Sequence, residues 1–158
     1  MSNSQSMCTS FMGELLTATH NFGTAPVRAA STADTFRGAL YLASATVNAS
    51  TTVYSSTGEV TGAGYSAGGV VVTNGTAPIA TNSSATAGVA YWTPSASLTY
   101  TSVTLTTAFD AVLIYNASQS NKAVSVHTFG SQTITAGTFT LTMPANTTST
   151  ALLRLATT

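Results

Sequence analysis

The sequence predicts an all-β protein, a jelly-roll-like β-sandwich with one short N-terminal helix. Three observations predict this fold class. Thr, Val, Tyr and Ile, which favour pleated and half-buried surfaces, dominate the chain after Gly23. Short runs of these residues alternate with turn signals at the close spacing typical of sandwiches and barrels. The length of 158 residues suits one domain with its own core.

The N-terminal region divides into two parts. Residues 1–9 are small and polar, and we expect them to form a flexible or docking arm ahead of a single domain that spans 10–158. Within 10–22 the apolar residues recur at the spacing of one helix face, namely Phe11, Leu15, Ala18 and Phe22. Ser10 suits the N-cap and Glu14 the first turn, so a short helix is expected here.

The first predicted strands lie on either side of a glycine-rich stretch. Residues 35–42 alternate with period two, which indicates a strand with one apolar face. A loop over 45–57 and the glycine-rich stretch over 58–69 follow. The pair Asn74-Gly75, the strongest two-residue hairpin signal, predicts that residues 70–73 pair with residues 77–80. Pro78 favours an edge position for the second of these strands.

The remaining strands are short and closely spaced. Turn signals such as Gly130-Ser131 and Ala136-Gly137 separate them. We expect these strands at 85–92, 98–105, 111–115, 123–129, 132–134, 138–143 and 151–155.

The composition excludes several classes of protein. Four Lys or Arg residues balance four Asp or Glu residues, while 32 Thr and 20 Ser supply much of the polar surface. Zero net charge leaves no electrostatic footprint for nucleic acid or anionic lipid. No run approaches 18 consecutive apolar residues, so no membrane span is expected. Near-zero net charge favours association over monodispersity, and we therefore expect a closed homo-oligomer.

One motif resembles a catalytic site. Residues 64–68 read Gly-Tyr-Ser-Ala-Gly and match the G-x-S-x-G nucleophile elbow, with Asp110 and His127 following in the hydrolase order. That chemistry needs Ser66 on a strand-to-helix turn, with His127 as base and Asp110 as its orienting group. The β-branched run after Gly69 predicts a strand instead of a helix. We therefore expect a structural glycine turn at Ser66 and no catalytic residues.

No other residues predict a bound metal or cofactor. Cys8 is the only cysteine, and His20 and His127 lie far apart without the spacing of metal ligands. Aromatic side chains on strands belong more often to a core or an interface than to a ligand site. The alternative is a sugar-stacking patch made by Tyr65, Tyr91, Trp92 and Tyr100.

Several segments together resemble one family. They are MCTSFMGELL with HNF (7–16 and 20–22), DTFRGALY (34–41), EVTGAGYSAGG (59–69), AVLIYN (111–116), AVSVHTFG (123–130) and the closing LLRL (152–155). These segments resemble small virion structural proteins of tailed bacteriophages, and most of all the head decoration, or cement, proteins.

The resemblance implies a structural function and no enzymatic one. The expected protein decorates and stabilises the capsid surface as a β-sandwich oligomer, a homotrimer, after assembly in the host cytoplasm. Its partners are other copies of itself and the major capsid protein, with no nucleic acid, membrane, cofactor or metal. The contact elements expected are the arm over 2–9 and the helix face of Phe11 and Leu15. The alternative is a tail, fibre or head-spike module that contacts host surface glycans.

Overall fold

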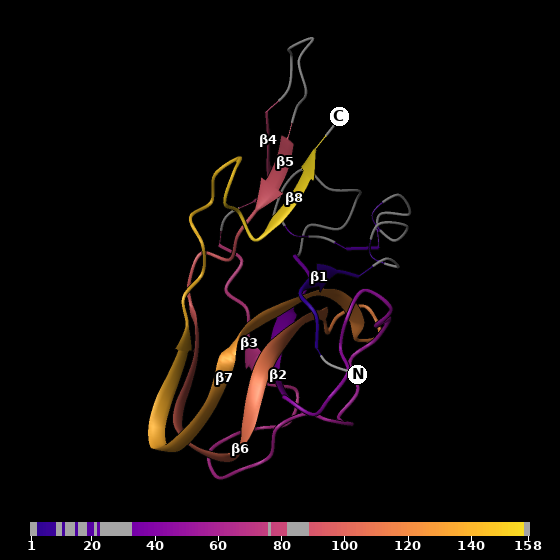
Figure 1. Ribbon diagram of the computed structural model, residues 1–158. Coiled ribbons are helices and arrows are strands. Elements are labelled where there is room, and N and C mark those ends of the chain that lie inside the picture. The colour runs from indigo at the N-terminus through magenta and orange to yellow at the C-terminus, as the bar shows by residue number, and fades with distance from the viewer. Residues whose placement is uncertain are drawn as a thin grey trace.

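The computed structural model describes residues 3–8, 11, 15, 19–20, 22, 33–75, 77–81 and 89–156. In these ranges eight strands form two antiparallel sheets, one of five strands and one of three (Figure 1). The all-β sandwich expected from the sequence is confirmed, and the more specific jelly-roll likeness stays a prediction. Most of the expected helix over 10–22 lies outside the described residues, and no helix is seen as an element within them.

The five-stranded sheet has the order β1-β7-β6-β2-β3. Its strands are β1 (Ser6–Met7), β2 (Phe36–Leu42), β3 (Val70–Val71), β6 (Leu98–Asn116) and β7 (Lys122–Leu141). The three-stranded sheet has the order β4-β5-β8. Its strands are β4 (Ile79–Thr81), β5 (Val89–Trp92) and β8 (Leu153–Ala156).

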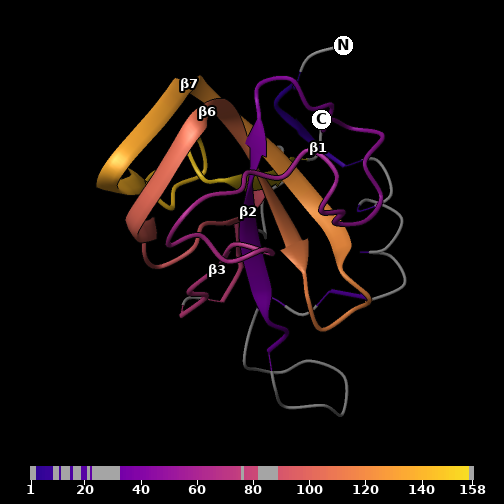
Figure 2. The same cartoon turned by 90° about the horizontal axis from the view of Figure 1, so that it is seen from below.

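Strands β6 and β7 form one long hairpin that dominates the molecule. They run for 19 and 20 residues, from the pair Leu98↔Leu141 to the pair Asn116↔Lys122. The register shifts at several points, and Ser102 and Ala136 adopt positive φ angles of 53° and 46°. Such irregularities increase twist and bend a strand, and the hairpin curves strongly along its length (Figures 1 and 2).

The Asn74-Gly75 hairpin predicted from the sequence is wrong. Strand β3, before this pair, joins β2 in the five-stranded sheet, whereas β4, after it, joins β5 in the three-stranded sheet. The chain therefore crosses between sheets where a hairpin turn was expected. The edge position expected from Pro78 is confirmed, because β4 is an outer strand of its sheet.

The described part of the N-terminal arm lies on the chain's own sheet. Ser6 and Met7 pair with Val126 and Ser125 of β7. The Asn3 amide donates to the Asp110 carboxylate at 2.5 Å and to the Leu42 carbonyl at 3.1 Å. The Cys8 side chain is fully buried. Ser6 and Met7 therefore form one edge of the five-stranded sheet, and the Asn3 side chain fastens the residues before them to the same body.

Aromatic side chains join the two sheets. Phe36 of β2 stacks on Phe22 with ring centroids 4.4 Å apart, and Phe22 meets Trp92 of β5 edge-on at 4.8 Å. Offset-stacked and edge-to-face pairs add stability beyond the area they bury. This cluster continues into a core of side chains from β2, β6 and β7.

Candidate functional site

The three residues of the possible hydrolase triad lie in different environments. Ser66 is exposed in a turn closed by the Gly69 N–H, which donates to the Ser66 carbonyl at 3.0 Å, and strand β3 follows directly. Asp110 accepts its hydrogen bond from Asn3. His127 Nε2 lies 2.9 Å from the Ser125 hydroxyl. The geometry of a catalytic triad, in which the base contacts the nucleophile and the acid contacts the base, is not formed by these side chains.

The sugar-stacking patch, which was the alternative to a core or interface role for these aromatic residues, is not formed by its four rings. Trp92 is 2% exposed in the aromatic cluster, and Tyr100 is 3% exposed. Tyr65 stacks on Tyr100 with centroids 6.0 Å apart. Tyr91 belongs to the other sheet and lines a different pocket. Their positions in two separate parts of the molecule explain why these four rings do not meet.

His20 and Asp34 form a structural polar cluster where β2 begins and β6 ends. The Asn116 amide donates to Asp34 Oδ2 at 2.7 Å and lies 3.1 Å from His20 Nδ1. The Gln119 amide donates to the other oxygen of Asp34 at 3.2 Å. Within the described ranges, no group of three or more His, Cys, Asp or Glu residues suited to a metal occurs, here or elsewhere.

The most concentrated polar arrangement is built around Glu59, which is 5% exposed. Its oxygens accept hydrogen bonds from the Tyr54 hydroxyl at 2.6 Å, the Tyr65 hydroxyl at 2.7 Å and the Gly68 N–H at 2.7 Å. Tyr65 in turn accepts the Leu40 N–H at 3.0 Å. A buried carboxylate is tolerated only with such partners. Glu59 therefore fixes the positions of Tyr65 and Gly68, and the Tyr65 hydroxyl in turn connects the glycine-rich segment to Leu40 of β2.

The tyrosines around Glu59 are held in their neutral, hydrogen-bonding form. Burial raises the pKa of Tyr65, and its hydrogen bond to the Glu59 carboxylate raises that pKa further. Burial likewise raises the pKa of Tyr41 to about 12, with Glu59 adding to the effect. Burial is also the main cause that raises the pKa values of Tyr54, Tyr100 and Tyr115.

Arg37 holds the far end of the glycine-rich segment. Its Nε donates to the Gly68 carbonyl at 3.1 Å and its Nη2 to the Gly69 carbonyl at 2.5 Å. The Tyr115 hydroxyl donates to the same Gly68 carbonyl at 3.0 Å. The guanidinium is therefore fixed in place, half-buried on β2.

An open hollow of about 220 Å³ lies beside Arg37. We call it the Arg37 hollow. The glycine-rich segment forms one wall and the start of β6 the other. Its lining residues are Arg37, Gly64, Tyr65, Ser66, Gly69, Val70, Thr99, Tyr100 and Thr101.

Sequence reasoning missed the Arg37 hollow. Its walls come from β2, the glycine-rich segment and the start of β6, which contacts between residues far apart in the sequence bring together. The Tyr100 hydroxyl donates to the Gly38 carbonyl, and Ala63 forms a β-bridge with Thr104. The one usable signal was the run of glycines beside Tyr65, because glycines allow a segment to lie close to a neighbouring backbone. Nothing in the sequence indicated that Arg37 would face this segment.

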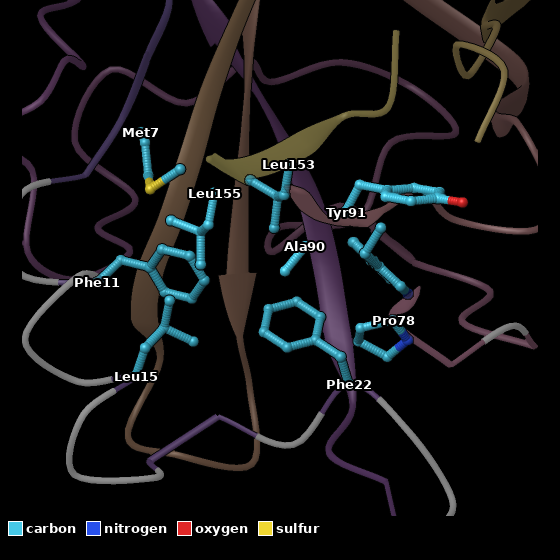
Figure 3. A pocket seen from close by; sticks show the side chains of 10 residues that line it. Met7, Phe11, Leu15, Phe22, Pro78, Ala90, Tyr91, Leu153 and Leu155 are labelled. Carbon is cyan, nitrogen blue, oxygen red and sulfur yellow. The ribbon is translucent and has the colours of Figure 1, made fainter. Parts of the chain in front are cut away.

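Two further pockets lie near the N-terminal strand. An apolar pocket of about 100 Å³ separates the N-terminal segment from the three-stranded sheet, and Tyr91, its one titratable lining residue, points its hydroxyl away from the other side chains (Figure 3). A hollow of about 320 Å³ lies between β1, β7 and β8 and includes His127 and Arg154. Burial lowers the pKa of His127 to about 4. The imidazole is therefore neutral at physiological pH.

No family model, curated protein or solved structure matches this chain. The part of the chain that the structure describes contains no helix long and apolar enough to cross a membrane.

Proposed function

We propose that this protein is a structural virion protein that decorates and stabilises the capsid of a tailed bacteriophage as a homo-oligomer, a trimer. The resemblance of its sequence segments to decoration proteins motivates the proposal. One structural observation supports the oligomer: large apolar side chains are exposed on the edge strands of a nearly uncharged protein.

Three of the four edge strands that the structure describes carry such a side chain. Val71 on β3 is 56% exposed, Ile79 on β4 is 42% exposed and Leu155 on β8 is 43% exposed. Edge strands in monomeric proteins are commonly protected from pairing by charges, Pro or bulges. Within these three strands and the residue before each, such protection comes from Pro78 ahead of β4 and Arg154 on β8. The β3 edge carries no such residue, so it is the edge best suited to association with further copies of the chain.

The described contacts also change which elements are expected to meet the capsid. Phe11 is 2% exposed and belongs to the core, so it cannot form a docking face. Residues 3–8 contact the chain's own β6 and β7. We therefore assign the contacts with the capsid to the edge strands and to the hydroxyl-rich surface around them.

Binding to an assembled shell would stabilise it by mass action. A protein that binds across the seams between capsid subunits, and does not bind dispersed subunits, shifts the equilibrium by RT ln(1 + [L]/Kd) per site. At a hundredfold excess over Kd this amounts to about 2.7 kcal/mol per site. Many such sites together would resist the internal pressure of packaged DNA.

The proposal is tested by locating the protein on a particle. Phage particles are treated with a labelled antibody against this chain and viewed by negative-stain electron microscopy. Label distributed over the head supports decoration. Label confined to the tail or to fibres contradicts it and favours the tail or fibre module that contacts host glycans. Particles from a phage that lacks the gene, treated in the same way, are the control for antibody specificity.

A further inference from the structure

The Arg37 hollow contains a fixed cation with no carboxylate facing it. A guanidinium has five N–H donors. Arg37 uses Nε and Nη2 on the carbonyls of Gly68 and Gly69 and is also hydrogen-bonded to the Tyr115 hydroxyl. Among the described residues, Arg37 forms no ion pair. N–H groups therefore remain for a ligand.

The described lining of the hollow carries one positive charge and no negative charge. Its described lining residues include no Asp or Glu. The nearest carboxylate along the network is Glu59, which is buried and whose two oxygens already accept hydrogen bonds from Tyr54, Tyr65 and the Gly68 N–H. An anion in the hollow would meet the guanidinium without facing an exposed carboxylate.

The other lining groups suit a ring that carries hydroxyls. Ser66, Thr99 and Thr101 are exposed and supply hydroxyl groups that both donate and accept hydrogen bonds. The half-buried Tyr65 supplies aromatic surface to the lining, and Tyr100, stacked on it, is buried. Aromatic surface with a few placed polar groups is the usual composition of small-molecule sites.

We propose that the Arg37 hollow binds a single sugar ring bearing a carboxylate, with the carboxylate on Arg37. Hydrogen bonds between a guanidinium and a carboxylate are charge-assisted and stronger than neutral ones, and the N–H groups of Arg37 that its backbone partners leave free would donate them. The volume of about 220 Å³ is below the roughly 300 Å³ at which drug-sized sites begin. The hollow therefore takes one acidic sugar residue, whether free or at the end of a glycan.

The site is built before the ligand arrives. Gly69 has φ +68°, and a Cβ at this position would lie 1.7 Å from the Gly38 carbonyl oxygen. Gly64 lies similarly close to the backbone of Ser102. The wall of the hollow thus rests directly on β2 and β6, and Arg37 is anchored to it. Preorganised groups lose little freedom on binding, which favours affinity. This inference does not depend on the position of the protein on a virion.

The test is a titration followed by ¹⁵N-¹H NMR of the full chain. The probe is glucuronate, and two matched compounds separate its parts: glucose keeps the ring without the carboxylate, and acetate keeps the carboxylate without the ring. Glucuronate is expected to shift the amide signals of Tyr65, Ser66 and Thr101. Its Kd is expected to be at least tenfold lower than those of glucose and acetate.

Two substitutions identify the cation. Arg37→Gln is expected to weaken glucuronate binding at least tenfold. Arg154→Gln removes the same charge from an exposed arginine outside the hollow and is expected to leave the Kd unchanged. If Arg37→Gln does not fold, the location of the shifted amides in the unaltered protein decides the question.

Three results would overturn the proposal. One is binding of acetate as tight as that of glucuronate, which would identify a simple anion site. Another is amide shifts that map outside the hollow. The third is unchanged glucuronate binding by a folded Arg37→Gln variant.

Discussion

Glu59 shows at the scale of single residues how an almost uncharged protein uses a charge. The carboxylate is removed from water, which is costly for an ion without partners. Three donors, the hydroxyls of Tyr54 and Tyr65 and the Gly68 N–H, surround it at 2.6 to 2.7 Å. Hydrogen bonds to a charged group contribute about 1.5–3 kcal/mol each. The Glu59 carboxylate therefore holds the surrounding loop in one conformation through these three hydrogen bonds.

Replacing this charge is expected to destabilise the protein. Glu59→Gln keeps the shape but turns one acceptor oxygen into a donor that faces a hydroxyl or an N–H. The free energy of unfolding should fall by about 1–3 kcal/mol, because a buried donor is left without an acceptor. Urea unfolding measures this change. The control is Gln132→Glu, which makes the opposite exchange of amide and carboxylate at an exposed position on β7. Equal midpoints for Glu59→Gln and the wild type would contradict the role given to Glu59.

His127 makes the stability depend on pH. Its pKa falls from 6.5 to about 4 on folding because the side chain is buried. Between these pH values the unfolded state binds more protons than the folded state. The free energy of unfolding is therefore expected to decrease as the pH drops from 6.5 to 4, and this contribution ends below pH 4. The expected loss is on the order of 3 kcal/mol, because each pKa unit corresponds to about 1.4 kcal/mol.

The measurement compares the wild type with His127→Gln. Both are unfolded in urea at several pH values, and the difference between them isolates the imidazole from the carboxylates that titrate in the same range. As the pH falls, the wild type should lose more of its free energy of unfolding than His127→Gln does. Two curves that stay parallel from pH 6.5 to pH 4 would show that His127 does not carry this dependence.

At the scale of elements, the glycine-rich segment lies flat on two strands. Gly69→Ala is expected to lower the free energy of unfolding by more than about 3 kcal/mol, since its φ of +68° and its contact with the Gly38 carbonyl leave no room for a methyl group. Gly130→Ala on β7 is the matched control, because a Cβ there would meet nothing within 4 Å. Thermal melting compares the two, and equal melting temperatures would contradict this packing.

The N-terminal strand is held by Asn3. Its side chain bonds the Asp110 carboxylate, the Leu42 carbonyl and the Val47 N–H, and Cys8, which directly follows the strand, is fully buried. Asn3→Ala is expected to raise local opening about tenfold, because it removes these bonds and leaves Asp110 without this donor. The reaction rate of the Cys8 thiol with Ellman's reagent measures the opening. Gln5→Ala, at an exposed position, should leave the rate unchanged; a rate for Asn3→Ala equal to that of Gln5→Ala would contradict the expectation.

The alternation and the turn signals in the sequence predicted where strands lie but not which strands pair with each other. The alternation over 35–42 predicted β2 almost residue for residue. The turn signals at Gly130-Ser131 and Ala136-Gly137 divided β7 into three predicted strands, because local signals do not distinguish a turn from an irregularity within a long hairpin. The Asn74-Gly75 pair fails for a related reason: strand pairing depends on contacts far apart in sequence, which a dipeptide does not encode.

The candidate site was less accessible from the sequence than the fold. The exclusion of Ser66 as a nucleophile rested on the strand that follows it, and the structure has that strand as β3. Residues 99–101 lie near Arg37 because the Tyr100 hydroxyl donates to the Gly38 carbonyl, a contact between residues far apart in the sequence. The sequence shows the residue types of the Arg37 hollow but not their proximity.

On the scale of the whole molecule, the exposed apolar edge strands and the small number of charges both favour an oligomer that is insensitive to salt. Contacts made by Val71, Ile79 and Leu155 would bury apolar surface and add few ion pairs. Salt screens ion pairs, since the Debye length falls from about 10 Å at 0.1 M to 3 Å at 1 M. Apolar contacts are not weakened in this way. An oligomer joined at these edges should therefore persist at high salt.

A lysine placed on an edge strand is expected to prevent association. Val71→Lys puts a charge on β3 in the manner by which natural edge strands avoid pairing. Thr57→Lys adds the same charge to an exposed loop and serves as the control. In size-exclusion chromatography with light scattering, Val71→Lys should shift the protein toward monomer, and Thr57→Lys should not. An unchanged mass for Val71→Lys would remove β3 from the interface.

Sedimentation velocity of the wild type at micromolar concentration, in 0.1 M and 1 M NaCl, tests the central claim most directly. A closed homo-oligomer, with a mass that is a whole multiple of 16.0 kDa and is the same at both salt concentrations, is the predicted result. A 16.0 kDa monomer at both concentrations, or an oligomer that dissociates at the higher salt concentration, would contradict it.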